Sequence, residues 1–563
     1  MKPKCFLTLL CLICISTANF AASPNNFAKT EPFAIRTMPP APKFTDSERQ
    51  TELANRRAKV VAAMDDRSAL ILMSAQPKIY TGDVDFLYRQ ENNLYYLTNL
   101  KQASSALVLI KDGAAAAKEI LFLPRREPSR ETWNGRMYSP DDATRISGVK
   151  TILDASELDN FIQSIKDKKL FSSTDKSVSA STTPENIYLL LPDNERDSDG
   201  MREFPEEYKF SKSLSGYEIK NAQPIFADLR VIKSAFEQKL LQHAIDITIE
   251  AQERAMATAK NVRFEYETQA EIEYVFRRRN ADYWGYPSIV GCGENGTTLH
   301  YVESQGAVKP TDLLLMDVGA EYEHLTADVT RTFPVGGKFS KEQAEIYQIV
   351  YDAQEAAAKT IKPGAMYYEP QNAARRVIEQ GLAKLGLITG VGALVPGTEQ
   401  QAPDGKGGTK TVGVPQFTLW FMHGWGHWLG MNVHDVGDYS KPFREGMVTT
   451  NEPGIYIRSD ALDYLPKTPE AQAVIAKIRP AFERYKNIGV RIEDDMLVTK
   501  TGVEWMTRKL PRSISDIEAF MASASKQTIS NKQAKQISPR IAVGVFDRDI
   551  IFTDMNRRLY NGK

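Results

Sequence analysis

The feature that most constrains the fold of this chain is an apolar run that ends directly in an acidic residue. Leu313–Met316 (LLLM) is followed by Asp317, a pattern that predicts a buried strand with a carboxylate at its end. A buried carboxylate without a partner is costly, which favours a cation beside it. Residues 326–332 alternate with period two, so Asp328 and Thr330 share one face. A strand–turn–strand arrangement can bring the two aspartates side by side, and a turn aspartate plus a surface aspartate is the alternative.

Histidines gather in one glycine-rich stretch. The chain has six histidines, and His423, His427 and His434 fall within twelve residues of one another. The glycines between them (HGWGHWLG) argue against a regular helix, so we expect the backbone to pass close to a site. One imidazole would then bind a metal and two would face a substrate. Three polar loop histidines are the alternative.

Two glutamates complete a candidate set of ligands. Glu452 precedes Pro453 and Gly454 at the predicted end of a strand, where these residues force a turn. Glu493 lies in VRIEDD, where period two places Arg491 on the same face, so Arg491 could orient a ligand carboxylate. Four carboxylates and one imidazole can hold a pair of divalent ions with a water between them. The candidate ligands are Asp317, Asp328, His427, Glu452 and Glu493.

Length, charge and cysteine count exclude several other classes of protein. A chain of 563 residues is too long for one core, so two or three domains are expected. Its 71 basic and 71 acidic side chains give no net field for nucleic acid or anionic lipid. Three of four cysteines (Cys5, Cys11 and Cys14) lie in the leader described next. A processed chain would keep only Cys292, which excludes an intramolecular disulfide and a cysteine-based zinc site and leaves a small buried filler.

Residues 1–22 have the pattern of a secretory signal. Lys2 and Lys4 precede an apolar run, Cys5–Ile15, which is followed by small residues. This run is far shorter than the roughly 20 residues that a membrane-spanning helix needs, and no later segment is apolar enough to span. We therefore expect export to the periplasm or the exterior, with release from the membrane; an anchor or a buried helix is the alternative.

The rest of the chain divides by composition. Residues 23–46 are rich in Pro and Ala and are predicted to form an extended linker. Residues 47–230 are predicted to form an α/β domain, because they hold strand-like apolar runs such as 69–72, 106–110 and 119–123. Residues 166–184, polar and rich in Ser, Thr and Lys, are expected to be a surface insertion.

A second predicted domain covers residues 231–522. It begins with Ser234 and Glu237, which have the spacing of a helix capping box, and an amphipathic pattern follows. Two insertions are expected inside it: residues 397–414, which are polar and glycine-rich, and residues 459–478, which are charged. Residues 523–563 form a tail to which the sequence assigns no role.

In this order, and with His300 in GENGTTLHY ahead of them, the candidate residues resemble those of the pita-bread metallopeptidases. The likeness is to the proline-specific branch, Xaa-Pro aminopeptidase (aminopeptidase P) and the related prolidase. Over residues 232–520 it rests on the motifs MDVGAEY, ADVTRTFPVGGKFS, HGWGHWLGMNVHDVG, NEPGIYI and VRIEDDMLVT. A weaker likeness covers YRQENNLYYLT and WNGR in the first domain. The resemblance implies a creatinase-like N-terminal α/β domain followed by a catalytic pita-bread domain, within the α/β (α+β) class.

The resemblance also implies a role for each ligand. Asp317 would bind one ion, Asp328 and Glu493 would bridge two ions, and His427 and Glu452 would complete the set of ligands that bind the second ion. A hydroxide formed between the ions would attack the peptide, and Glu452 would carry the proton of that water to the leaving nitrogen.

Other residues are assigned to the substrate side or to support. The substrate-side histidines of the family map onto His300, His423 and His434, with His434 a donor to the oxyanion. Thr330 and Arg491 are expected to support the ligands. Tyr456 and Trp425 could form walls for a proline ring, and core packing is the alternative for both.

The resemblance and the donor chemistry together predict cofactor and substrate. Mostly hard oxygen ligands favour manganese, with cobalt or zinc as alternatives. The substrates would be proline-containing peptides, because an Xaa-Pro bond lacks an N–H and needs a dedicated pocket. Between His434 and Glu452 only Arg444 could hold a dipeptide carboxylate, which favours aminopeptidase P over prolidase. A metal-free binding module or a non-peptidase hydrolase remains an alternative. The family often forms homo-oligomers, so we expect one.

Overall fold

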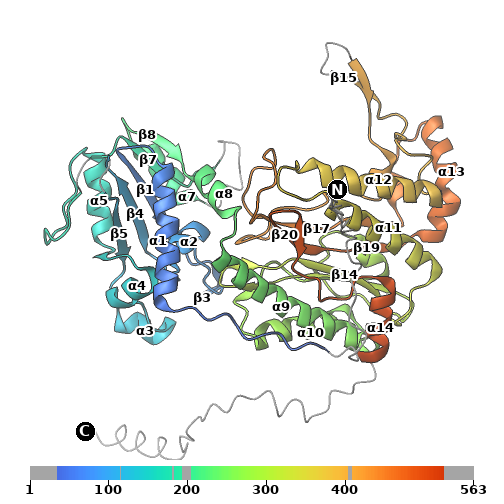
Figure 1. Cartoon of the computed structure of the whole chain (residues 1–563), viewed down its shortest axis with the longest axis horizontal. Coiled ribbons are helices and arrows are strands. Elements are labelled where there is room, and N and C mark those ends of the chain that lie inside the picture. Colours follow the sequence, from blue (N-terminus) through green and yellow to red (C-terminus); the bar gives the residue numbers. More distant parts are fainter. Residues whose placement is uncertain (1–34, 114–115, 181–182, 193–203, 404–408, 525–563) are drawn as a thin grey trace, which may run out of the picture. The chain divides into compact units, whose positions relative to one another are not determined.

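The structure, a computed structural model, describes residues 35–113, 116–180, 183–192, 204–403 and 409–524 (Figure 1). The predicted leader and nearly all of the predicted tail lie outside the described residues. Within the described part, no helix is long and apolar enough to cross a membrane.

The first half of the chain is built on a six-stranded mixed sheet with the strand order β6-β5-β4-β1-β7-β8. The middle strands pair antiparallel, β1 with β4 and β4 with β5, whereas β6, β7 and β8 join parallel to their neighbours. The three predicted apolar strands are present. The strands are β1 (Ser68–Met73), β4 (Ala106–Lys111), β5 (Lys118–Leu123), β6 (Thr151–Asp154), β7 (Asn186–Leu189) and β8 (Glu218–Asn221).

Helices cover both faces of this sheet, which is why β1 and β4 are buried almost without interruption. On one face Phe161 of α5 packs with Ile71, Val108 and Phe122 from the strands. The helices of this half are α1 (Asp46–Ala63), α2 (Asn92–Thr98), α3 (Pro128–Asn134), α4 (Pro140–Ser147), α5 (Glu157–Lys166), α7 (Pro205–Ser213) and α8 (Gln223–Arg230). A small hairpin of β2 (Ile79–Thr81) and β3 (Val84–Asp85) lies apart from the sheet.

One sequence prediction for this half needs correction, and a second gains a contact that the sequence does not show. Residues 166–184 are not only a surface insertion, because Phe171 is buried and its ring lies 5.3 Å from that of Phe161. A single aromatic anchors this polar stretch to the core. Residues 35–44 of the predicted linker form no helix or strand, as expected, and they are docked onto the second half of the chain. Arg36 pairs with the buried Glu253 at 3.0 Å.

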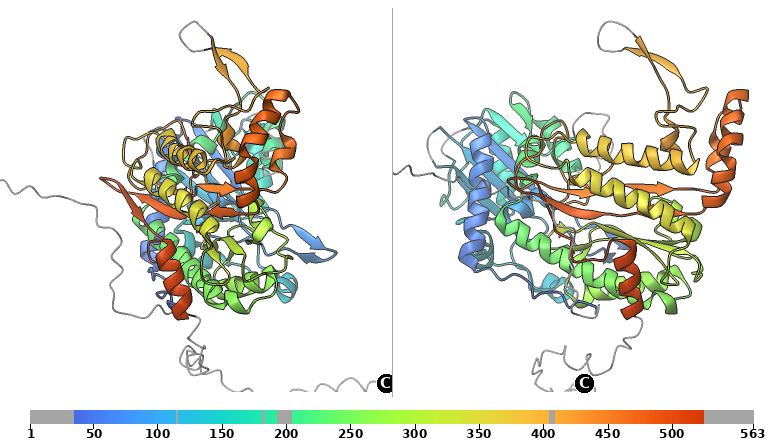
Figure 2. Two further views of the ribbon diagram at one scale, coloured as in Figure 1. Left: turned by 90° about the vertical axis from the view of Figure 1, so that its right-hand side faces the viewer. Right: turned by 45° about the vertical axis from the view of Figure 1, so that its right-hand side comes forward.

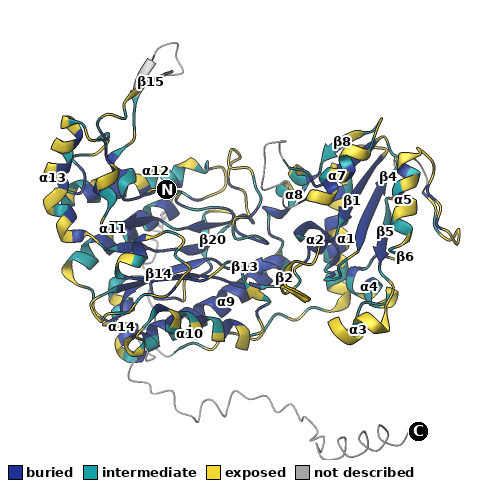
Figure 3. Ribbon diagram, turned by 180° about the vertical axis from the view of Figure 1, so that it is seen from behind, coloured by how far each residue is buried: buried dark blue, intermediate teal, exposed yellow. Residues whose placement is uncertain are grey.

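The second half places strands between two helical layers. Figures 1 and 2 agree that α9 and α10 lie on one side of β14 and β20 and that α11 and α12 lie on the other. The buried residues concentrate along the strands and the inner helix faces (Figure 3). The helices are α9 (Ala235–Thr258), α10 (Glu265–Arg278), α11 (Lys341–Ala358), α12 (Tyr368–Leu385), α13 (Pro469–Tyr485) and α14 (Ile514–Ala524).

Short antiparallel sheets make up the strand layer. One has the order β10-β11-β14, a second β13-β12-β9 and a third β17-β20-β21, while β18 pairs with β19. These strands are β9 (Tyr283–Trp284), β10 (Ile289–Cys292), β11 (Leu313–Val318), β12 (Ala320–Tyr322), β13 (Leu325–Thr326), β14 (Val329–Pro334), β17 (Val448–Asn451), β18 (Gly454–Tyr456), β19 (Gly489–Arg491), β20 (Asp494–Val498) and β21 (Val503–Trp505). Short 3-10 turns complete the half: η1 (Ala259–Asn261), η2 (Gly293–Thr297), η3 (Gln416–Leu419) and η4 (Ala461–Tyr464).

Local sequence signals in this half are matched by the structure. The Ser234 side chain accepts from the backbone N–H of Glu237, and the Glu237 carboxylate accepts from that of Ser234, so the predicted capping box starts α9. Cys292 is buried in β10, as expected for a small filler, and burial raises the pKa of its thiol. Each of these signals depends on a few neighbouring residues, which is why it can be recognised from the sequence alone.

The two expected insertions differ in structure. Residues 397–414 include a two-stranded hairpin of β15 (Gln400–Pro403) and β16 (Thr409–Val412). Residues 459–478 are not a surface insertion throughout, because their second part begins α13. Ile475 and Ile478 are buried there, and Phe482 in the same helix packs against Trp420. The apolar residues of α13 repeat at helical spacing, which the many charges between them obscure.

Candidate metal centre

The pairing of β11 with β14 brings the two predicted aspartates together. Asp317 lies opposite Thr330 in the antiparallel register, and Asp328 directly precedes β14. Both carboxylates lie 2.5 Å from the hydroxyl of Tyr286, through Oδ1 in each case. A phenol has one proton and can donate to only one of them. The phenol oxygen and the aspartate oxygen that does not receive this proton therefore need a shared proton or a cation between them.

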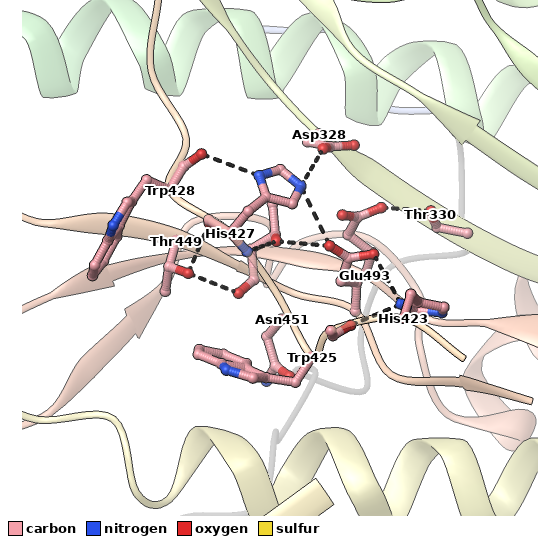
Figure 4. Close-up of polar contacts among 12 residues, drawn as sticks. Asp328, Thr330, His423, Trp425, His427, Trp428, Thr449, Asn451 and Glu493 are labelled. Carbon is pink, nitrogen blue, oxygen red and sulfur yellow. Dashed lines mark hydrogen bonds and ion pairs between the residues drawn. The ribbon is translucent and has the colours of Figure 1, made fainter. Parts of the chain in front are cut away.

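His427 adds a nitrogen to the same cluster. Its Nε2 lies 3.2 Å from Oδ2 of Asp328 and 3.3 Å from Oε1 of Glu452. Its Nδ1 donates to the carbonyl oxygen of Trp428 at 3.1 Å (Figure 4), which fixes the tautomer that leaves Nε2 facing the carboxylates. As predicted, the glycine-rich stretch forms no helix here. Backbone bonding to β17 holds it instead, since Thr450 N donates to His427 O at 2.9 Å.

Glu493 closes the set from the break between β19 and β20. Its Oε2 accepts from the hydroxyl of Thr330 at 2.6 Å. Ligand atoms of Asp328, His427 and Glu493 all lie within 4.8 Å of one another and could hold a metal ion. Asp317 and Glu452 adjoin this group, so all five predicted ligands converge.

Among the described residues, Arg491 is the one guanidinium that bonds a carboxylate group of this cluster. It donates to Oδ2 of Asp317 at 2.6 Å and to the hydroxyl of Tyr456 at 2.8 Å. The predicted support of a ligand carboxylate by Arg491 is thus matched by a contact. Thr330 likewise contacts a ligand, Glu493.

The electrostatics of the cluster show a shortage of positive charge. Burial, with Asp328 next to it, raises the pKa of Glu493 well above its usual range, and burial raises that of Glu452 to about 7. Burial works in the same direction on Asp317, but Arg491 and Tyr286 outweigh it and lower its pKa. For His427, Asp328 and Glu452 outweigh the effect of burial and raise its pKa to about 9. Three buried carboxylates and the partly buried Glu452, beside one guanidinium, are the donor set that divalent cations would neutralise, so the residues fit two such ions.

A cavity of about 670 Å³ opens beside the cluster. All five candidate ligands line it, together with His300, His423, His434 and Arg491. The three histidines that the resemblance assigned to the substrate side therefore share one cavity with the ligands. Apolar walls come from Ile289, Leu299, Val302 and Val433.

His423 and His434 have lowered pKa values and are therefore neutral at physiological pH. Burial, with the Arg491 charge nearby, lowers the pKa of His423 to about 3. Its Nδ1 donates to Gly424 O at 2.7 Å and its Nε2 accepts from Tyr456 at 2.9 Å. Burial lowers the pKa of His434 to about 4, and its ring lies 4.2 Å from that of His427. A neutral imidazole can donate one hydrogen bond to a substrate oxygen.

Two predicted substrate walls are corrected by the structure. Tyr456 is fully buried and lies outside the cavity lining, and its hydroxyl instead connects Arg491 with His423. Trp425 is also buried, with its ring 5.1 Å from that of Tyr367. Both aromatic rings are used for packing, which was the alternative, so Tyr456 supports cavity residues without facing the cavity.

Three residues of the site were missed from the sequence. Tyr286 precedes β10 in a short turn that carries no catalytic signal. Asp495 accepts from the backbone N–H of Asp328 at 3.3 Å, and its place in the acidic run IEDD was a usable hint. Glu265 accepts from the backbone N–H groups of Cys292 and Gly306, both at 2.6 Å. It also accepts from Asn295 and Tyr301, and so it holds the loop that carries His300.

Comparison with known proteins follows the same division of the chain. Residues 239–500 match the profile of metallopeptidase family M24, and residues 53–171 match the aminopeptidase P N-terminal domain. The chain is 35% identical over 481 residues to Xaa-Pro aminopeptidase of Haemophilus influenzae, covering 84% of this chain and 97% of that protein.

The chain belongs to metallopeptidase family M24.

Other M24 relatives agree in sequence and structure. Xaa-Pro aminopeptidase of Escherichia coli K12 is 33% identical, with 84% of this chain and 98% of that protein covered. The solved aminopeptidase P from E. coli with the inhibitor Pro-Leu superimposes with a TM-score of 0.67 at 31% identity, covering 85% of this chain and 99% of that one. A zinc-substituted E. coli aminopeptidase P in complex with product gives a TM-score of 0.68 at 31% identity over 85% and 99%.

These matches confirm the resemblance and the fold class, an N-terminal α/β domain followed by an M24 pita-bread domain. They also identify the chain as an enzyme, a metallo-aminopeptidase. The roles assigned to individual site residues and the domain boundaries stay predictions.

Proposed function

We propose that this protein is a Xaa-Pro aminopeptidase, which removes the first residue from peptides whose second residue is proline. The observation that carries the proposal is the convergence of five candidate metal ligands, three of them close enough to share one ion, on a cavity that three histidines also line. The relatives named above carry this activity in their names.

The cofactor that we propose is a pair of divalent ions, with manganese preferred and cobalt or zinc as alternatives. The holding residues would be the five candidate ligands, with Asp328 and Glu493 placed between the ions. Two such ions would lower the pKa of a water between them, so that hydroxide becomes available near neutral pH. Support comes from the four clustered carboxylates, of which only Asp317 pairs with a guanidinium among the described residues.

The other residues of the cavity would bind and orient the peptide. His434 and His300 line the cavity, and we assign them hydrogen bonds to the peptide carbonyl oxygen as negative charge develops on it. Glu452, at the cavity wall, would take a proton from the attacking water and return it to the proline nitrogen. His423 already bonds Gly424 and Tyr456, so we assign it to shaping the wall.

Peptide length is the finer question within this function, and the charge of the cavity bears on it. In the part of the chain that the structure describes, Arg491 is the only lysine or arginine that lines the cavity, and it donates hydrogen bonds to Asp317 and Tyr456. Arg444, the alternative anchor for a dipeptide carboxylate, is exposed and outside the lining. Among the described residues, the cavity therefore has no lysine or arginine free to pair with the carboxylate of a dipeptide. This favours longer peptides as substrates, and hence an aminopeptidase over a prolidase.

The decisive experiment offers two substrates to the manganese-loaded protein. An Ala-Pro dipeptide and a pentapeptide that begins Ala-Pro are compared by kcat/KM. We expect the pentapeptide to be cleaved with the higher kcat/KM, releasing free alanine. Preference for the dipeptide would replace the aminopeptidase with a prolidase, and cleavage of neither would reject both.

Export and self-association complete the proposal. Support for export is the charged and apolar pattern of residues 1–22. N-terminal sequencing of protein recovered from outside the cytoplasm should begin close after residue 22; recovery of chains starting at Met1 would contradict it. A homo-oligomer is proposed by analogy with the family, and sedimentation at micromolar concentration would test it.

A further inference from the structure

His434 lies in a segment without helix or strand. Its own imidazole makes little contribution to holding the side chain in place. Among the described residues, the imidazole of His434 has no hydrogen-bond partner, and its nearest ring is that of His427. The position of the ring therefore follows from the backbone of Gly430–Asp435. What holds that segment decides where His434 points.

Two side chains from the first half of the molecule hold the middle of this segment. Arg89 donates from Nη2 to the carbonyl oxygen of Met431 at 2.8 Å. Asn92, in the first turn of α2, donates from Nδ2 to Oδ1 of Asn432 at 2.7 Å. Glu321 fixes the Arg89 guanidinium by accepting from its Nε at 2.9 Å. Both donors thus reach a segment more than 300 residues away in the sequence.

A buried cluster of three charged side chains fixes the end of the segment next to His434. Asp435 accepts from Nη2 of Arg230 at 2.5 Å, and Lys233 lies 3.3 Å from its other oxygen. All three side chains are almost fully buried. Buried charges need their partners, so this end of the segment is costly to displace. Arg230 also donates to Asn93 at 2.8 Å, which ties the cluster to α2 as well.

We propose that Arg89 and Asn92 are positioning residues for His434, so that the first half of the chain sets the geometry of the catalytic cavity. This inference rests on the proposed function for the role of His434. Neither residue lines the 670 Å³ cavity. Arg89 does face a neighbouring cavity of about 490 Å³ that His434 also lines, so direct contact with peptide is the competing explanation that the test must separate.

The kinetic test combines Asn92→Ala and Arg89→Ala with His434→Ala in the full-length, manganese-loaded protein. Displacing a catalytic group by a fraction of an ångström lowers the rate more than the binding, so each single variant should lose about tenfold in kcat with KM changed by less than about twofold. In the His434→Ala background the same changes should cost less than about twofold in kcat, because the group they position is gone. A full, additive loss in that background, or a loss expressed mainly in KM, would overturn the proposal.

A matched control separates positioning from general loosening between the halves. Arg49 also joins them, through a bidentate pair with Glu323 at 2.7 and 2.8 Å, but it does not touch the His434 segment. Arg49→Ala should leave kcat within about twofold of wild type. Equal losses in Arg49→Ala and Arg89→Ala would contradict a specific role for Arg89.

A measurement independent of activity keeps the two proposals apart. The amides of Gly430 and Asp435 are hydrogen bonded at 3.2 and 2.9 Å, so their exchange with deuterium reports on the segment. Asn92→Ala and Arg89→Ala should raise exchange at residues 430–435, and Arg49→Ala should not. If the wild type cleaves no Xaa-Pro peptide, the proposed function fails, and the exchange pattern still decides the positioning. Unchanged exchange in both variants would refute it.

Discussion

Arg491 donates a hydrogen bond to Asp317 at 2.6 Å, and both side chains are buried at the wall of the cavity. The same guanidinium holds Tyr456, which in turn bonds His423. One arginine thereby orients a candidate metal ligand and a histidine of the cavity together. A planar group with several fixed donors suits this double task, and an ammonium does not.

Arg491→Lys should separate these tasks. Lysine keeps the charge but cannot hold both Asp317 and Tyr456, so metal affinity should fall about 10- to 100-fold. Titration calorimetry with manganese measures this fall. Arg444→Lys, at an exposed position outside the cavity, is the control and should bind manganese as the wild type does. Unaltered affinity in Arg491→Lys would contradict the orienting role.

Asp328→Asn and Glu493→Gln should each abolish hydrolysis of an Xaa-Pro-Xaa peptide, with kcat/KM lowered by more than about 100-fold. Each change removes a negative oxygen from between the two proposed ions while it keeps the shape of the side chain. The matched control is Asp463→Asn, an exposed aspartate that does not line the cavity. Near-normal turnover by either variant would refute its assignment as a bridging ligand.

The stabilisation of the protein by manganese should increase with pH. In the metal-free protein the pKa of Glu452 is raised to about 7 and that of His427 to about 9. Each pKa is higher in the folded protein than in the unfolded chain. The stability that these two protonated groups contribute is therefore present at low pH, and it is lost as pH rises through 7 for Glu452 and then through 9 for His427. Metal binding needs both groups deprotonated, and it therefore gains as pH rises.

Thermal unfolding at pH 5.5 and pH 8, with and without manganese, tests this sign. The difference in Tm between loaded and metal-free protein should be larger at pH 8. A difference that is equal at both pH values, or larger at pH 5.5, would contradict the ligand set.

Glu265→Gln should weaken the loop that carries His300. The carboxylate accepts from four donors, and an amide would turn its own N–H groups toward two of them. Leaving such buried groups unpaired should cost about 2–3 kcal/mol of unfolding free energy. Urea denaturation measures the loss, and kcat with the Ala-Pro pentapeptide should fall in parallel. Arg277→Gln, an exposed change in the same helix, should alter neither.

Much of the fold was predictable where the signal was local. The capping box at Ser234, the strand ending in Asp317 and the break at Glu452 are all present, because each depends on residues within a turn or a strand. Polar stretches that contain a few buried apolar residues were wrongly predicted to be surface insertions. Phe171 and Ile475 pack into cores although their neighbours in the sequence are polar or charged.

The sequence by itself determined which side chains could bind metal, since a carboxylate or imidazole at a strand end is a property of a few adjacent residues. Only the tertiary structure decided which other side chains contact and orient them. Tyr286 between two aspartates, Arg491 on Asp317, and Arg89 and Asn92 on the His434 segment are contacts between residues far apart in the chain. Such contacts depend on how strands and helices pack, and neither spacing nor composition records them.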